Sequence, residues 1–115
     1  MHGLNVIPKR RQKLKLMKLI IAVVRPFLID RIVVALEDIE GFPGATFVDA
    51  RGFGQQLRNS RDELLNPLHD VKQIEIVAPD DMVEQIVATI NEHAHTGKTG
   101  DGIIFVLPVK QSVLI

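Results

Sequence analysis

Two short runs of consecutive apolar residues constrain the fold of this 115-residue chain most strongly. Residues 19–24 read Leu-Ile-Ile-Ala-Val-Val, and residues 103–107 read Ile-Ile-Phe-Val-Leu. Each run is short for a helix, and the first ends just before Pro26, so both predict strands, over 18–24 and 103–109. Because successive residues of a strand point to opposite faces of a sheet, both strands should be apolar on both faces.

Four further elements are predicted between these strands. Apolar residues at spacings of three and four predict an amphipathic helix over 29–39, and β-favouring residues predict strands over 45–53 and 71–78. A second helix should open at 79–81, with Asp81 and Glu84 at capping-box spacing, and should stop at Gly97. Residues 54–70 have no period and predict a long loop between the two middle strands.

This order, β-α-β-β-α-β, predicts an α+β, ferredoxin-like sandwich. Two helices cover one face of a four-stranded sheet, so the apolar outer face needs another cover, and further copies of the same chain are the simplest one. A charge at Ile20, Val23, Phe105 or Val109 should then break the assembly. Residues 17–115 are expected to form this single domain, and residues 1–16, with five bases and no apolar period, a basic, loosely ordered N-terminal extension.

Composition excludes several classes of function. Seven of the fourteen bases precede Asp30, so the remaining seven face all fourteen acids, and such an acidic body is a poor nucleic-acid binder. The absence of cysteine excludes disulfides, thiolate catalysis and cysteine-based metal sites, and it fits a cytoplasmic location. No run approaches the roughly 20 apolar residues that span a bilayer, so we expect no membrane insertion.

Two glycine-rich segments are candidates for binding phosphate. In residues 96–102 and 52–54, glycine permits conformations in which consecutive amides point at an anion. The alternative for 96–102 is a helix C-cap followed by a tight turn. Neither segment matches a nucleotide-binding motif, because Glu92 stands where a P-loop needs glycine and Leu57 where the dinucleotide fingerprint needs it.

The remaining polar residues do not assemble into a recognisable catalytic group, so we predict that the protein is not an enzyme. His93 and His95 stand at the end of the second helix, where the helix dipole stabilises a cationic imidazole without a metal. A metal site that uses His93, His95 or His69 is the alternative.

In chain order, five segments resemble the P-II signal-transduction family: residues 17–20, 25–27, 51–54, 74–81 and 96–106. The resemblance implies a homotrimer with a nucleotide in the clefts between subunits. It also implies a set of nucleotide-binding residues: Gly52, Phe53, Gly54, Gln55, Gln56, Glu75, Thr96, Gly100, Asp101 and Gly102.

Departures from the family pattern affect the expected ligand. Gln55 and Leu57 replace the arginine and lysine of the family's Arg-Gln-Lys, and Ile103 replaces a phosphate-binding lysine. Val113 and Ile115 stand at about the positions of two further arginines. The resemblance, with these cations missing, implies that ADP or AMP rivals ATP and that magnesium binding is doubtful.

The resulting prediction is a regulatory protein that senses an adenine nucleotide weakly and controls a membrane transporter or an enzyme through the loop at 55–70. The residues of that loop expected to dock on the partner are Arg58, Ser60, Arg61, Asp62 and Glu63. Two alternatives are a metal-homeostasis trimer similar to CutA or to P-II-like proteins associated with metal efflux, and a structural adaptor without a ligand.

Overall fold

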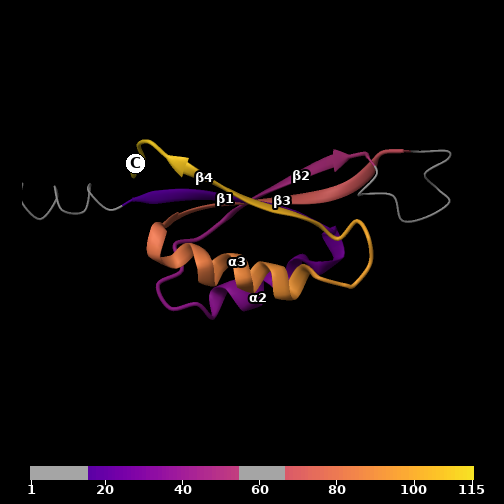
Figure 1. The fold of residues 1–115 in the computed structure, drawn as a ribbon, viewed down its shortest axis with the longest axis horizontal. Helices are drawn as coiled ribbons and strands as arrows, with labels where there is room; N and C mark the ends of the chain where they lie inside the picture. Colours follow the sequence, from indigo (N-terminus) through magenta and orange to yellow (C-terminus); the bar gives the residue numbers. More distant parts are fainter. Residues whose placement is uncertain (1–15, 55–66) are drawn as a thin grey trace, which may run out of the picture.

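The computed structural model describes residues 16–54 and 67–115 and forms one sheet with two helices packed against it (Figure 1). The elements follow the predicted β-α-β-β-α-β order, with a short 3-10 helix added before the first α-helix. Their bounds are β1 Met17–Val24, η1 Pro26–Leu28, α2 Ile29–Glu37, β2 Thr46–Gly52, β3 His69–Pro79, α3 Asp80–Ala94 and β4 Gly102–Val109.

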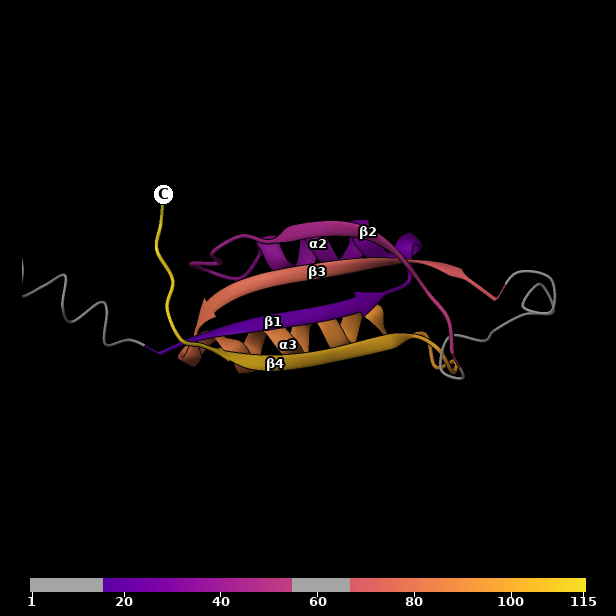
Figure 2. The ribbon, with the colours of Figure 1, turned by 90° about the horizontal axis from the view of Figure 1, so that it is seen from above.

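The sheet has the strand order β2-β3-β1-β4, and all neighbouring strands are antiparallel (Figure 2). Strand β1 lies in the middle, where Ile20 pairs with Ile76 of β3 on one side and with Val106 of β4 on the other. This arrangement confirms the predicted α+β, ferredoxin-like fold.

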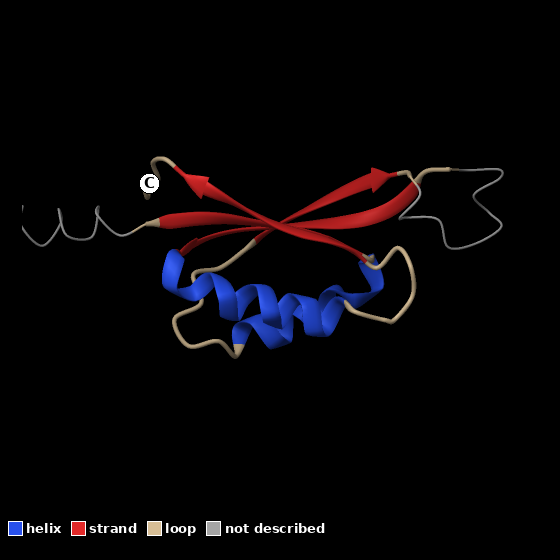
Figure 3. Ribbon diagram, viewed as in Figure 1, coloured by secondary structure: helices blue, strands red, loops and turns tan. Residues whose placement is uncertain are grey.

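Both α-helices lie on the same side of the sheet (Figure 3). Helix α2 buries Ile32 and Leu36, and α3 buries Ile86, Ile90 and Ala94, each four residues from the next. Side chains four apart share one stripe of a helix, so each helix turns an apolar stripe to the sheet and its polar positions to solvent.

The core fills the space between the helices and the sheet. Strand β1 contributes Ile20 and Ala22, both fully buried, and β3 contributes Ile74 and Ile76. Ile20 therefore faces the helices, and the expectation that a charge at Ile20 would act on assembly is wrong. Such a charge would lie in the core of the single chain, and the free energy of unfolding would fall instead.

The opposite side of the sheet carries no helix among the described residues, and we call it the helix-free face. Ile21 on β1 stands beside Phe105 on β4, and Val23 stands beside Ile103 in the next row on this face. Its apolar members include Met17, Leu19, Ile21, Val23, Val48, Val77, Ile103, Phe105, Leu107 and Val109. Because Ile103 and Phe105 are 52% and 42% exposed, the face is apolar and uncovered in the single chain, as the two apolar runs predict.

Two local predictions need correction. No side chain caps the start of α3, and Asp81 lies within the helix, so Asp81 and Glu84 do not form a capping box. The backbone amide of Asp80 instead donates to the carbonyl oxygen of Leu16 over 2.9 Å. Strand β3 begins at His69, so the last two residues of the predicted 55–70 loop belong to the sheet.

No helix in the described part of the chain, residues 16–54 and 67–115, has the length and apolarity needed to cross a bilayer.

Candidate functional site

The loop that joins α3 to β4, residues 96–102, is organised around the carboxylate of Asp101. The backbone amides of Thr96 and Gly97 donate to Asp101 Oδ2 over 2.6 and 3.1 Å, and the Thr96 hydroxyl donates to Asp101 Oδ1. The amide of Lys98 donates to Thr96 Oγ1 over 3.3 Å. The start of the loop therefore wraps around a side chain from its own end.

Arg25 reaches the same carboxylate from the end of β1. Its Nε donates to Asp101 Oδ1 over 3.1 Å, and its Nη2 donates to the carbonyl oxygen of Thr99, also over 3.1 Å. Both members of the ion pair are largely buried, with 14% of the Arg25 side chain and 16% of the Asp101 side chain exposed. Since Val24 pairs with Gly102, the sheet itself brings Arg25 to the loop.

These contacts keep Asp101 ionised. Partial burial acts to raise the pKa of the Asp101 carboxyl, but the hydrogen bonds from Thr96, Arg25 and Gly97 outweigh it and hold the pKa well below the ordinary aspartate value. The start of the loop therefore binds an anion, and this anion is the protein's own carboxylate. Phosphate binding by the loop stays a prediction.

Glycine is required along this loop. Gly97, Gly100 and Gly102 have φ values of 88°, 91° and 135°, a region that residues with a Cβ rarely adopt. Helix α3 ends at Ala94, with His95 as its C-cap, so Gly97 does not itself terminate the helix as predicted. The glycines instead let the chain turn tightly around Asp101.

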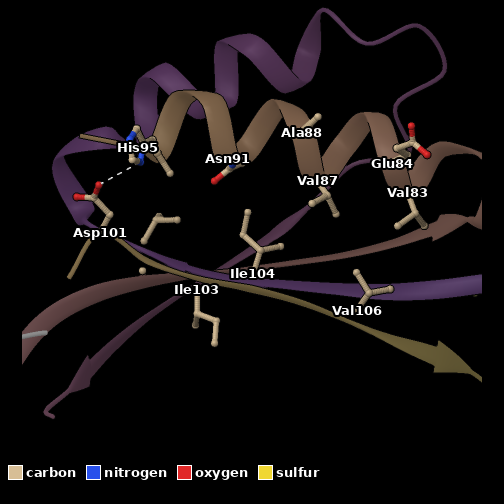
Figure 4. A pocket seen from close by; sticks show the side chains of 13 residues that line it. Val83, Glu84, Val87, Ala88, Asn91, His95, Asp101, Ile103, Ile104 and Val106 are labelled. Atoms are coloured by element: carbon tan, nitrogen blue, oxygen red, sulfur yellow. Dashed lines mark ion pairs between the residues drawn. The ribbon is translucent and has the colours of Figure 1, made fainter. Parts of the chain in front are cut away.

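A groove of about 710 Å³ runs beside this loop, between α3 and β4 (Figure 4). Apolar side chains line it from both elements, including Val87 and Ile104. At one end His95 Nδ1 lies 3.7 Å from Asp101 Oδ2. In Figure 4, Ile104 points toward α3, whereas Ile103 points to the other side of the sheet.

The second glycine-rich segment, Gly52 to Gly54, begins at the last residue of β2, at the same end of the sheet as the 96–102 loop. Gly52 pairs with His69, and the side chain of Phe53 is 71% exposed. Strands β2 and β4 are the two outer strands, with β3 and β1 between them. The described hydrogen bonds do not join this segment to the 96–102 loop.

Other predicted site residues lie apart or outside the described residues. Glu75 is on the helix-free face, paired in register with Ile21 and Thr46, and accepts a 2.8 Å hydrogen bond from Gln73 Nε2. It is not part of the 96–102 loop. The following predicted residues lie outside the described residues: Gln55, Gln56, Arg58, Ser60, Arg61, Asp62 and Glu63.

The three histidines considered as metal ligands, His69, His93 and His95, have separate surroundings. His93 Nδ1 donates to the carbonyl oxygen of Thr89 over 2.8 Å, and His95 lies by Asp101. His69 starts β3, where its Nε2 is buried without a hydrogen-bond partner. Within 16–54 and 67–115, no three His, Cys, Asp or Glu residues gather as metal ligands. The structure therefore gives no support to a metal site at His69, His93 and His95.

Arg25 is the residue of this site that sequence reasoning missed. In the sequence, Arg25 belongs to an Arg-Pro-Phe motif that contributes to the resemblance to the P-II family, but the motif gives Arg25 no role in the site. The ion pair with Asp101 joins residues 76 positions apart, and no local pattern contains it. One signal in the sequence could have identified Arg25. It is a base directly after a predicted strand, where that strand is expected to pair with the strand that follows the glycine-rich loop.

Comparison with known proteins gives consistent matches. Residues 17–115 match the family model described as nitrogen regulatory protein P-II. Nitrogen regulatory protein P-II of Azospirillum brasilense is 40% identical over 104 residues, covering 86% of this chain and 91% of that protein. Nitrogen regulatory protein P-II 1 of Escherichia coli K12 is 41% identical over 104 residues, with the same coverage. The crystal structure of Arabidopsis thaliana PII bound to citrate has a TM-score of 0.68 and 39% identity, covering 83% of this chain and 78% of that one.

Proposed function

This chain belongs to the P-II family of signal-transduction proteins, and from that premise we propose that it senses an adenine nucleotide and relays the signal to a partner protein. The observation that carries the proposal is the 96–102 loop, whose backbone is held by hydrogen bonds to Asp101 and Arg25 of the same chain. A loop held by its own side chains binds an anion at a lower cost of ordering than a free loop does.

The working unit is a homotrimer in the cytoplasm. The helix-free face supports assembly, because Phe105 and its apolar neighbours would otherwise stay in water. Assembly would also complete the nucleotide site. Gly52 to Gly54 lies at the end of the outer strand β2, and the 96–102 loop leads into the other outer strand, β4, so a neighbouring copy can bring one segment to the other.

The nucleotide is held mainly by backbone amides of 52–54 and 100–102. Among the described residues of the 96–102 loop, Lys98 is a base that the Asp101 network leaves unpaired. Ile103, which follows the loop, carries no charge, and Arg25 already pairs with Asp101. Few cations therefore face a triphosphate, so ADP or AMP binds as well as ATP, and magnesium contributes little.

The protein regulates a partner and does not catalyse a reaction. Loop 55–70 is the docking segment for a membrane transporter or an enzyme, and Arg58 and Arg61 steer a charged partner toward it. Replacing both arginines with alanine should abolish co-purification of the partner. The control Arg31→Ala, which changes an exposed arginine of α2, should leave co-purification unchanged. Co-purification unchanged by the loop variant would contradict the docking role.

Calorimetric titration of the full chain with ATP, ADP and AMP, with and without magnesium, tests the nucleotide proposal. The expected result is that ADP or AMP binds at least as tightly as ATP. A citrate titration belongs beside it, because the Arabidopsis relative is bound to citrate. Gly100→Val should abolish binding of all three nucleotides, because φ at this position is 91° and a β-branched residue would distort the loop. Absence of adenine nucleotide binding at millimolar concentration would refute the proposal.

A further inference from the structure

The anion bound by the 96–102 loop is part of the protein itself, the side-chain carboxylate of Asp101. The amides of Thr96 and Gly97 and the hydroxyl of Thr96 all donate to it. These three donors are therefore not free for a phosphate. The amide of Gly100, at the far side of the loop, is not used by any of the described hydrogen bonds of the loop.

Arg25 is also occupied by the protein. One side of its guanidinium holds Asp101, and the other holds the carbonyl oxygen of Thr99, the residue before Gly100. With Arg25 and Asp101 both largely buried, their charges compensate each other and neither is presented to solvent as a free charge. Arg25 therefore ties Thr99 and Asp101, the two residues that flank Gly100, to the end of β1.

We propose that Arg25 and Asp101 form a latch that positions the amides of the loop for a nucleotide phosphate, without either side chain touching the ligand. The inference rests on the proposed function, because it assigns a positioning role within that nucleotide site. With the latch intact, Thr99 and Gly100 are held at a fixed distance from β1. Loss of either side chain frees Gly100 and its neighbours to move away from the arrangement that binds phosphate.

The direction in which Asp101→Asn changes the affinity for nucleotide distinguishes a latch from a direct electrostatic role. Asp101→Asn removes a negative charge from beside a polyanion site, so an effect through charge alone would strengthen nucleotide binding. A latch predicts the opposite, because the asparagine amide nitrogen cannot accept the hydrogen bonds that the carboxylate accepts. We expect ADP and AMP to bind about tenfold more weakly or worse, the usual effect of a lost charge-assisted hydrogen bond.

Arg25→Gln should weaken binding to the same extent as Asp101→Asn, and the double variant should be no weaker than either single one, because both break the same unit. Arg25→Lys should restore part of the affinity. Lys18→Gln and Asp80→Asn are matched controls: Lys18 is also a base on β1, and it pairs with Asp80 over 3.4 Å at the other end of the sheet. Neither control should change nucleotide affinity.

Amide hydrogen exchange, followed by NMR on the full chain without nucleotide, provides a readout independent of binding. The amides of Thr96 and Gly97 should be protected in the wild type and in the two controls, and at least about tenfold less protected in Arg25→Gln and Asp101→Asn. Strand amides of β1 should keep their protection in every variant, which shows that the fold is intact. If Asp101→Asn fails to fold, Arg25→Gln carries the same test.

The outcomes distinguish the latch from the proposed function. Weaker nucleotide binding together with lost protection at Thr96 and Gly97 supports the latch. Tighter or unchanged binding in Asp101→Asn, or unchanged protection in both latch variants, overturns it. If the wild type binds no nucleotide, the proposed function fails, and hydrogen exchange alone then decides whether Arg25 and Asp101 hold the loop.

Discussion

The carbonyl oxygen of Val23 occupies the space that any side chain at Gly102 would need. A Cβ atom added to Gly102 would stand 1.9 Å from that oxygen, and the contact is with backbone, which cannot rotate away as a side chain can. Strand β4 starts at Gly102, at the point where the 96–102 loop enters the sheet. The close approach of two backbones therefore sets where the loop ends and the strand begins.

Gly102→Ala should lower the free energy of unfolding by about 3 kcal/mol, because it adds this clash to an unfavourable φ of 135°. Gly97→Ala is the matched control. Its φ of 88° is also unfavourable, but nothing lies within 4 Å of the added Cβ, so the cost should be about 1 kcal/mol. Urea denaturation at one fixed protein concentration measures both. Equal costs for the two variants would show that the Val23 contact relaxes.

Phe105→Asp should convert the assembly to monomers, because it places an unpaired charge in the middle of the helix-free face. Val23→Asp and Val109→Asp should have the same effect, since both residues share that face. Val34→Asp is the control, because Val34 is 62% exposed on α2, on the other side of the molecule. Native mass spectrometry reads the oligomeric state. A wild-type monomer at micromolar concentration would contradict the proposed assembly.

Ile103→Lys should raise the affinity for ATP relative to ADP by about tenfold or more, because a lysine directly after the loop adds a cation for the terminal phosphate. Ile103 is half exposed and lies at the loop end of the helix-free face, so the longer side chain does not enter the core of the single chain. Because this face is the proposed assembly surface, native mass spectrometry must first show that the variant forms the same oligomer as the wild type. Ile103→Gln has a similar shape without the charge and should leave the preference unchanged. Calorimetric titration of the three proteins compares them, and an equal gain from glutamine would exclude the charge as the cause.

The pH dependence of stability should differ between the wild type and Asp101→Asn. Because the folded-state pKa of Asp101 is depressed, the carboxylate stabilises the fold fully above its unfolded pKa, about 4, and this contribution is lost as the pH falls below that value. The gap in the free energy of unfolding between the two proteins should therefore be largest at pH 6–7 and should shrink toward pH 3. A gap that is constant between pH 7 and pH 3 would show that ionisation of Asp101 does not stabilise the fold.

Local pattern was sufficient for most of the fold. The apolar runs at 19–24 and 103–107, with the helical spacing of Ile32, Leu36 and Ile39, correctly predicted the element order and the apolar face without helices. These features are periodic over a few residues, and the period follows from backbone geometry alone. The start of α3 at 79–81 was predicted correctly, but its capping box was wrong, because several acids stand at the first turn and their spacing does not show which amide they reach.

The candidate site depended more on tertiary structure. In the sequence, the glycines of 96–102 indicated either a phosphate cradle or a helix C-cap with a tight turn, and did not show that Asp101 would occupy the loop. That was decided by the pairing of Val24 with Gly102, which brings Arg25 to Asp101 across 76 positions. The assignment of Ile20 to the core and of Val23 to the helix-free face likewise required the register of β1. Sequence determines what each segment can form, whereas long-range pairing determines which side chains meet, because neither partner in such a contact constrains the other locally.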